Sequence, residues 1–340
     1  MSSLVSTLVG ILFLVVVVGF LAFTGLRLGI AFLVRRLAGL IFVLFGVTFI
    51  TFILGYFAPQ SAVIAQLGQH ATPHAIAALR DSYGLNLPWY AQYGRYVNGL
   101  LHLDLGTSWV NSSQSVWSII QLYLPASAVL GIAGLVLALI IGVPLGVAAA
   151  VRAGSRLDGS VQGVGLILYA LPSFVIIPFY FLLMVWLHGQ GLPSLAISGW
   201  GTADTMIAPI LIFAAGVFAY YLRLTRSSML ETLRQDYVRT ARAKGIRERT
   251  VVWRHAFRNA ILPLISAVGP AVALVVVGLF IIEDFFNIPG IGNYAITSVF
   301  QGDYPVVEAI GILLALAVVF MNLVADVAYG LADPRIRTTS

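Results

Sequence analysis

The chain contains no cysteine, and only 9% of its 340 residues are charged. The absence of cysteine excludes disulfide bonds, thiolate metal sites and thiol catalysis. The five histidines are scattered and form no His-Glu-x-x-His zinc motif. Strands of alternating apolar and polar residues, typical of a membrane β-barrel, are absent too. These absences leave few ways to build a catalytic or metal site.

Apolar residues are abundant instead. They make up 60% of the chain, whose mean hydropathy of +0.97 excludes an ordinary soluble domain. Several runs approach or exceed twenty residues, the length at which a helix crosses about 30 Å of hydrocarbon. We predict apolar segments near 4–26, 38–57, 124–151, 161–187, 206–224, 263–282 and 306–330. The first is either a seventh crossing or a peripheral helix.

Basic residues lie almost entirely on one predicted side. With the C-terminus inside, 17 of the 19 lysines and arginines fall in inside loops, and only Arg80 and Arg95 fall outside. Ten of them lie in residues 223–258, between two apolar segments. This asymmetry predicts a cytoplasmic C-terminus. The net charge of +6 is concentrated in short loops, so it indicates contact with a lipid bilayer and not with nucleic acid.

Two outside segments contain signals of local structure. In residues 58–123, Thr72-Pro73 predicts a helix start, Gly84 a helix end and Pro88 the start of a second helix. The second helix carries aromatic residues, which either rest at the membrane interface or contact a partner protein; they are Trp89, Tyr90, Tyr93 and Tyr96. Residues 283–305 contain proline and glycine among apolar residues, which predicts a re-entrant turn packed against protein.

Pro172 lies inside the predicted span 161–187, where it predicts a kink. The kink either serves packing or frees a carbonyl group that contacts a substrate. Among ionisable residues in the spans, Asp326 is the main candidate for a functional role, with capping or packing as the alternative. No catalytic set emerges, which argues against an intramembrane enzyme. No clear inverted repeat or midplane site indicates a secondary transporter.

The basic loop has the pattern of a short cytoplasmic helix. Ser228-x-x-Glu231 fits a capping box and predicts a helix start. The residues from Tyr237 to Lys244 favour helix, and Gly245 predicts its end, at a positive φ. A short helix that leads back into the membrane can act as a lever on a span. The alternative is a solvated loop that only fixes the topology.

The same loop carries a resemblance to a known family. It reads DYVRTARAKG at 236–245 and RHAFRNAILP at 254–263. These segments resemble the first of the two permease subunits of ABC importers of the dipeptide, oligopeptide and nickel type. The general signature is Glu-Ala-Ala, three residues, Gly, nine residues, then Ile-x-Leu-Pro. Only Ala241 and Gly245 match this signature strictly. The variant of the signature that is typical of the peptide-type permeases fits the two segments better.

The resemblance runs from about residue 33 to 337 and includes LPWYAQYGRYVNGLLHLDLGTSW, FNIPGIGNY, DYPVV and YGLADPRIR. It implies an all-α polytopic membrane protein with the type I ABC importer transmembrane fold and six family spans, to which residues 1–32 add an extra apolar segment. The implied permease domain is 33–337, with an external region at 58–123, a coupling loop at 225–262 and a cytoplasmic tail at 338–340.

The resemblance also implies the partners. These are a homologous second permease subunit, two ATPase subunits that bind ATP and Mg, and an external substrate-binding protein. The chain itself is expected to be non-catalytic, to bind no cofactor or metal, and to lack the phosphate-binding motif. The expected location is the cytoplasmic (inner) membrane of a bacterium or archaeon. The residues implied in ATPase coupling are Arg239, Thr240, Ala241, Arg242, Ala243, Lys244, Gly245, His255 and Arg258.

Three features depart from the family pattern. Segment 4–26 is extra, APQSA at 58–62 replaces an expected Pro-Gly-Asp-Pro-like turn, and the outside loop 188–205 is short. The first bears on the number of spans, and the other two on the fit of substrate and partner. Peptides are the expected substrate, with nickel chelates, glutathione or another small solute as the alternative. Trp89, Tyr90 and Tyr93 are the expected contacts with the binding protein.

Overall fold

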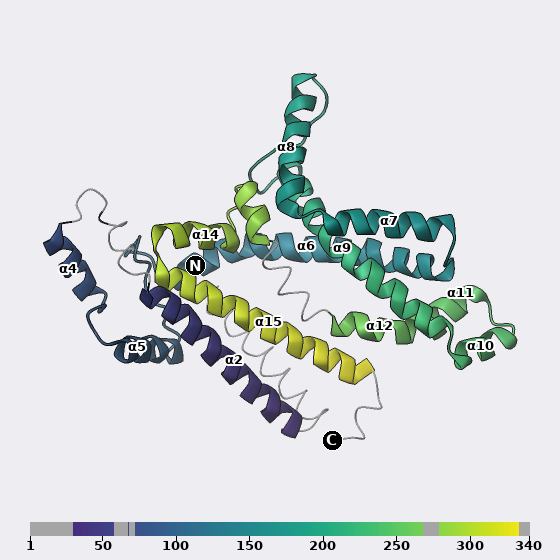
Figure 1. Ribbon diagram of the computed structural model, residues 1–340, viewed down its shortest axis with the longest axis horizontal. Coiled ribbons are helices and arrows are strands. Elements are labelled where there is room, and N and C mark those ends of the chain that lie inside the picture. Colours follow the sequence, from purple (N-terminus) through teal and green to yellow (C-terminus); the bar gives the residue numbers. More distant parts are fainter. Residues whose placement is uncertain (1–29, 58–66, 68–71, 268–278, 333–340) are drawn as a thin grey trace, which may run out of the picture.

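The computed structural model describes residues 30–57, 67, 72–267 and 279–332. Within these ranges every regular element is a helix, and one isolated bridge pairs Thr107 with Ser115. Long helices form the body of the molecule, and shorter ones gather at its ends (Figure 1). In chain order the elements are α2 (Ile30–Phe57), α4 (Pro73–Ser82), α5 (Trp89–Leu101), α6 (Val116–Val151), α7 (Arg156–Ala170), α8 (Ser173–Gly189), α9 (Ala203–Leu233), α10 (Asp236–Ala243), α11 (Glu248–Thr250), η2 (Val251–Ala256, π-helical), α12 (Phe257–Ser266), α14 (Ile291–Gln301) and α15 (Tyr304–Ala332). Residues 279–285 are also helical.

Four predicted spans correspond to helices that are long and apolar enough to cross a membrane. They are Ala38–Phe57, Val116–Val151, Ala203–Leu233 and Tyr304–Ala325. The bent pair α7–α8 brings the number among the described residues to five if it counts as one span. The predicted segment 4–26, most of 263–282 and the C-terminal tail 338–340 lie outside the described residues.

A row of small residues lets α6 approach α9 closely. Gly134, Ala138, Gly142 and Gly146 recur every fourth residue, so they share one face of α6, and all four are buried. A β-carbon at Gly146 would lie 2.7 Å from the carbonyl oxygen of Leu222 in α9. Small residues at this spacing allow helix backbones to pack tightly in apolar surroundings. The α6–α9 pair is therefore the central contact of the fold.

The predicted span 161–187 is not one kinked helix. It consists of α7 and α8, which meet at an angle of 97°. Leu171 is extended at the junction, and Pro172 precedes the first residue of α8. Proline disfavours a helical conformation in the residue before it and lacks the N–H that a continuous helix needs. The structure thus corrects the expected kink to a full break, beyond which α8 projects away from the bundle (Figure 1).

The local signals in the region before α6 are confirmed. The side chain of Thr72 accepts a hydrogen bond from the N–H of Ala75, and proline follows at the first helical position of α4. Helix α4 ends just before Gly84, which has a φ of +68°. Pro88 lies directly before α5, as predicted. The predicted and observed helix ends agree here because helix capping depends on residues that are close together in the chain.

A turn interrupts the helical structure after residue 285, as the proline and glycines of this segment predicted. The helical residues 279–285 end in a turn, and α14 begins at Ile291. Phe286 and Ile288 in the turn are fully buried, in a cluster with Ile177 of α8 and Phe213 of α9. The prediction that this turn packs against protein is therefore confirmed.

The shorter helices lie at opposite ends of the long axis. Figure 1 shows α4, α5 and α14 at one end, and α10, α11 and the turn between α6 and α7 at the other. The first group belongs to segments predicted outside, and the second to loops predicted inside. The arrangement of the ends agrees with the loop assignment, while the side of the membrane that each end faces stays a prediction.

Candidate coupling site

The short helix of the basic loop begins later than predicted. Ser228 lies inside α9, before its last turn, and is buried, so the capping-box prediction at this residue was wrong. Helix α9 continues to Leu233 because Met229 and its neighbours pack against the chain's own core, where an interruption would expose them. The chain turns at Arg234 and Gln235, and α10 starts at Asp236.

Gly245 ends α10 in the manner predicted. Its φ is +73°, a conformation that strains any residue with a β-carbon. The N–H of Gly245 donates to the carbonyl of Arg242 at 2.9 Å, and the N–H of Ile246 donates to that of Ala241 at 3.4 Å. These two bonds form a Schellman motif, and Ile246 and Ala241 belong to one apolar cluster, as is common for this motif. The end of α10 is therefore well defined.

Helix α10 packs on an apolar cluster formed by four other elements, here called the seat. Val238 and Ala241 are buried on its inner face. They pack in one cluster whose other buried members are Val147 and Ala150 of α6, Met229 of α9, Val251, Val252 and Ala256 of η2, and Ala260 of α12. The hydroxyl of Tyr237 also accepts a hydrogen bond of 2.7 Å from the amide of Asn259 in α12. Apolar contacts and a hydrogen bond therefore join α10 to these helices.

The predicted coupling residues divide between two faces. Thr240 and Ala243 of α10 are exposed, whereas Ala241 is buried on the inner face, so these three small residues do not share one exposed surface. Among the charged residues, Arg242 forms an ion pair of 2.8 Å with Glu248 across the turn at Gly245. Of the remaining predicted residues, His255 is half-buried. The others are exposed: Arg239, Lys244, Gly245 and Arg258.

Arg242 and Glu248 are each about half exposed, with side-chain fractions of 43% and 53%. Hydrogen bonding to Arg242 lowers the pKa of the Glu248 carboxyl below its usual value. The pair therefore stays charged at neutral pH and braces the turn after α10. Because solvent screens it, its contribution to stability is small. Arg239 lies 3.8 Å from Asp236, and both side chains are largely exposed.

The chain returns towards α12 through the π-helical turn η2. It follows α11 directly and contains Trp253 and His255. Wider turns of this kind are rare and occur often at functional sites. Val251, Val252 and Ala256 of η2 lie in the seat beneath α10. The sequence had predicted a return to the membrane here, without any sign of the change in helix type.

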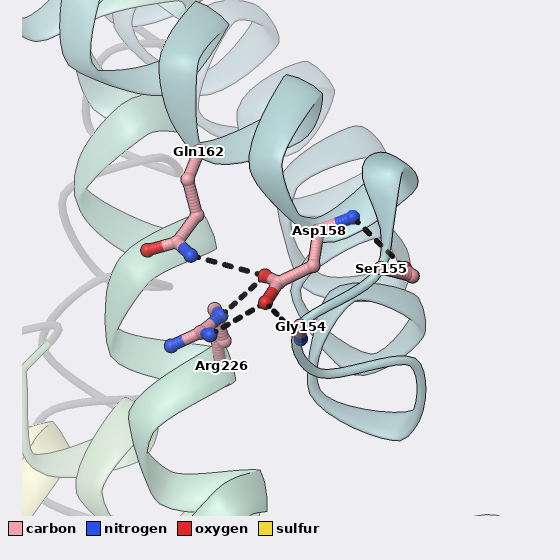
Figure 2. Close-up of polar contacts among 5 residues, drawn as sticks. All are labelled: Gly154, Ser155, Asp158, Gln162 and Arg226. Atoms are coloured by element: carbon pink, nitrogen blue, oxygen red, sulfur yellow. Dashed lines mark hydrogen bonds and ion pairs between the residues drawn. The ribbon is translucent and has the colours of Figure 1, made fainter.

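A buried ion pair joins the same end of the bundle to α7, and sequence reasoning missed it (Figure 2). Arg226 of α9 donates to both carboxylate oxygens of Asp158, at 2.6 and 2.7 Å. The N–H of Gly154 and the amide of Gln162 donate to the same carboxylate at 2.9 and 3.0 Å. The side chains of Asp158 and Arg226 are 5% and 21% exposed. This network fixes the α6–α7 turn to the part of α9 that leads into α10.

The aromatic residues predicted to contact a binding protein do not all lie at the surface. Trp89 and Tyr90 are 47% and 65% exposed on α5. Tyr93 packs against α2, where its ring lies 5.2 Å from that of Phe52 and its hydroxyl bonds Thr48 at 3.1 Å. The structure thus leaves two of the three rings available at the surface and uses the third to hold α5 on α2.

Two family models match the chain. Residues 142–338 match the family described as binding-protein-dependent transport system inner membrane component, and residues 29–131 match the model of the N-terminal part of such components. The two matches together cover most of the described structure, including α10 and its seat.

The chain is similar to several named permeases. It is 33% identical over 316 residues to the oligopeptide transport system permease protein AppB of Bacillus subtilis (strain 168), covering 90% of this chain and 99% of that protein. It is 33% identical over 335 residues to the dipeptide transport system permease protein DppB of Escherichia coli (strain K12), covering 90% and 98%. It is 35% identical over 333 residues to the di/tripeptide transport system permease protein DppB of Pseudomonas aeruginosa (strain UCBPP-PA14), covering 91% and 99%. Because one family model spans more than half of the chain and the relatives match it almost end to end, the chain belongs to the family of inner membrane components of binding-protein-dependent transport systems.

Proposed function

We propose that the chain is the permease subunit of an ATP-driven importer of di- or oligopeptides and forms half of the passage. The observation that carries the substrate class is the set of relatives named for dipeptide, di/tripeptide and oligopeptide transport, each matched over about nine tenths of this chain. A homologous second permease subunit would supply the other half. An external binding protein would deliver the peptide, and Trp89 and Tyr90 are exposed where they can contact it.

In this proposal α10 receives the partner ATPases, which bind ATP and Mg. Its inner face is fixed to α6, α9, η2 and α12 by apolar contacts, and its outer face presents Arg239, Thr240 and Ala243. A short helix with small and basic residues outward can seat in a groove lined by acidic groups. Closure of the ATPases would move α10, and the apolar seat would pass the movement to the long helices. The chain would perform no hydrolysis itself.

We also propose the span count and domain limits that the family implies. The permease domain would be 33–337 with six spans, residues 1–32 would add an N-terminal apolar segment, and 338–340 would form a tail. Four long helices and the broken pair α7–α8 support five of the six spans. The predicted apolar segment 263–282, most of which lies outside the described residues, would be the sixth. The C-terminus would be cytoplasmic, in the inner membrane of a bacterium or archaeon.

A cross-linking experiment tests the docking of α10. Ala243 is exposed and Ala241 is buried on the same helix, so the same replacement by cysteine gives a matched pair. The chain has no cysteine of its own. In the complex with its ATPase subunits, Ala243→Cys should cross-link to an ATPase subunit through a short thiol-reactive linker, and Ala241→Cys should not. Equal cross-linking at both positions, or none at Ala243, would contradict the docking.

A further inference from the structure

Helix α14 begins at a buried carboxylate. Glu283 is fully buried, and its Oε2 accepts hydrogen bonds from the N–H groups of Gly292 at 2.7 Å and Asn293 at 3.1 Å. These are free N–H groups of the first turn of α14, where the helix dipole favours a negative charge. A β-carbon at Gly292 would lie 2.8 Å from the same oxygen, so glycine is what allows this close approach.

The start of α14 is also tied to two other elements. The hydroxyl oxygen of Ser127 in α6 accepts a bond of 2.8 Å from the N–H of Ile291. In the preceding turn, the carbonyl of Phe286 accepts a bond of 2.8 Å from the N–H of Gly199, in the loop between α8 and α9. Directional bonds to α6 and to this loop therefore fix where α14 begins.

The other end of α14 meets a second buried carboxylate. Gly302, at a φ of +71°, ends the helix, and Asp303 follows with 2% of its surface exposed. Its carboxylate accepts a bond of 2.9 Å from the N–H of Trp109 and another from the hydroxyl of Ser108. Trp109 stacks on Tyr83 with ring centroids 4.4 Å apart. Asp303 thereby fastens the segment that contains α4 and α5 to the α14–α15 junction.

Neither carboxylate forms an ion pair with a lysine or arginine among the described residues. Both rely on backbone N–H and hydroxyl donors, which act only at short range and in defined directions. A buried carboxylate that loses such donors is strongly disfavoured, so the donors and the carboxylates hold one another in place. These bonds therefore hold three segments that are distant in the sequence at defined positions relative to one another.

We propose that Glu283 and Asp303 are positioning residues that make α14 a rigid bracket, so that α6, α14 and the segment from α4 to Ser115 move as one unit. The inference rests on the proposed function in one respect, namely that this end of the bundle receives the binding protein. The bracket keeps the exposed rings of Trp89 and Tyr90 at a fixed position relative to the passage. A binding protein then meets a surface that is already arranged.

A distance measurement tests the bracket without reference to transport. Spin labels at Ser113 and Thr297, both exposed, report the separation of the external segment and α14 in the complete importer. We expect one narrow distance distribution in the parent, a broad one in Asp303→Ala and a narrow one again in Asp303→Asn, which retains an acceptor. Ser112→Ala, at an exposed residue of the same segment, is the control and should stay narrow.

For the start of α14, labels at Ser118 and Thr297 should give a broad distribution in Glu283→Ala and a narrow one in Glu283→Gln. The exposed neighbour provides the control Asp284→Ala. If an alanine variant does not assemble, Ser108→Ala removes one donor to Asp303 and should still broaden the distance between 113 and 297. Narrow distributions in Asp303→Ala and Ser108→Ala, or a narrow distribution in Glu283→Ala, would overturn the proposal.

A second readout separates positioning from stability. If the receiving surface is correctly arranged for only a tenth of the time, the half-saturating concentration of loaded binding protein rises about tenfold. Asp303→Ala should therefore raise this concentration for ATPase stimulation, with the basal rate unchanged. A purely stabilising role would lower the maximal rate at an unchanged half-saturation, and that result would contradict the proposal. Failure of the parent complex to import peptides would instead contradict the proposed function, since the distance measurement does not depend on it.

Discussion

Replacing Asp158 by asparagine removes the negative charge from the buried pair between α7 and α9. Asparagine retains the size of the side chain and one acceptor oxygen, so the hydrogen bond from Gly154 or from Gln162 can persist. The two donors of Arg226 lose their charged partner. The variant therefore tests the ion pair more than the packing around it.

The size of the effect follows from burial. Exposed pairs contribute about 0–1 kcal/mol, whereas breaking a buried pair costs about 3–5 kcal/mol. Asp158 is 5% exposed and Arg226 is 21% exposed, so the pair is close to the buried case. Because the long side chain of Arg226 retains some contact with water, we expect a loss of about 3 kcal/mol, at the lower end of the buried range.

Unfolding of the purified protein by denaturant in detergent micelles measures this loss. Glu248→Gln provides the matched control, because it breaks an ion pair whose side chains are about half exposed, and it should cost less than about 1 kcal/mol. Adding Arg226→Gln to Asp158→Asn should recover part of the stability, since no unpaired buried charge remains. A loss for Asp158→Asn no larger than that for Glu248→Gln would show that the Asp158–Arg226 pair does not behave as a buried ion pair.

Three further predictions concern the loop, the topology and the N-terminal segment. Gly245→Val should cost about 1–2 kcal/mol locally, because it forces a β-branched residue to a positive φ, and it should reduce uptake while the spans still insert; full uptake with normal ATPase coupling would contradict this. Cysteines at the exposed residues Ser113 and Ser227 should react with an impermeant reagent in intact cells only at 113, and the reverse result would overturn the orientation. Deletion of residues 2–26 should lower stability or assembly modestly and leave coupling intact; full assembly without substrate-stimulated ATPase activity would show a mechanistic role.

Local signals in the sequence predicted local structure well. The starts of α4 and α5 and the end of α10 were predicted because proline fixes φ and glycine adopts a positive φ without strain, whatever surrounds them. The same reasoning predicted the irregular turn after residue 283. Long apolar runs likewise predicted four long helices, since their length follows from the thickness of the membrane.

Packing decided whether a capping pattern in the sequence marks the start of a helix. Ser155-x-x-Asp158 and Ser228-x-x-Glu231 fit the same pattern, yet only Ser155 caps a helix in the structure. Ser155 follows a turn in which Gly154 has a φ of +80°, so a new helix must begin there. Ser228 follows residues of α9 that are held against α6. The sequence pattern alone could not distinguish these two settings.

The buried carboxylates were the main omission. Asp158 meets Arg226 across 68 residues, and Asp303 meets Ser108 across 195, and no sequence spacing indicates such partners. Glu308 lies within the last predicted span but was overlooked in favour of Asp326. In the structure its carboxylate lies beside Gly55 of α2, where a β-carbon would come within 3.0 Å. An acid near the start of an otherwise apolar run was the available signal.

In the proposed function, this chain converts the closure of partner ATPases into peptide import through α10. The most direct test is uptake of a labelled dipeptide into proteoliposomes that contain this chain, the second permease subunit, both ATPase subunits and the loaded binding protein. We expect uptake that requires ATP and every component, and that falls when Gly245→Val distorts the end of α10. Uptake by this chain alone under an ion gradient, or unchanged ATP-driven uptake in that variant, would contradict it.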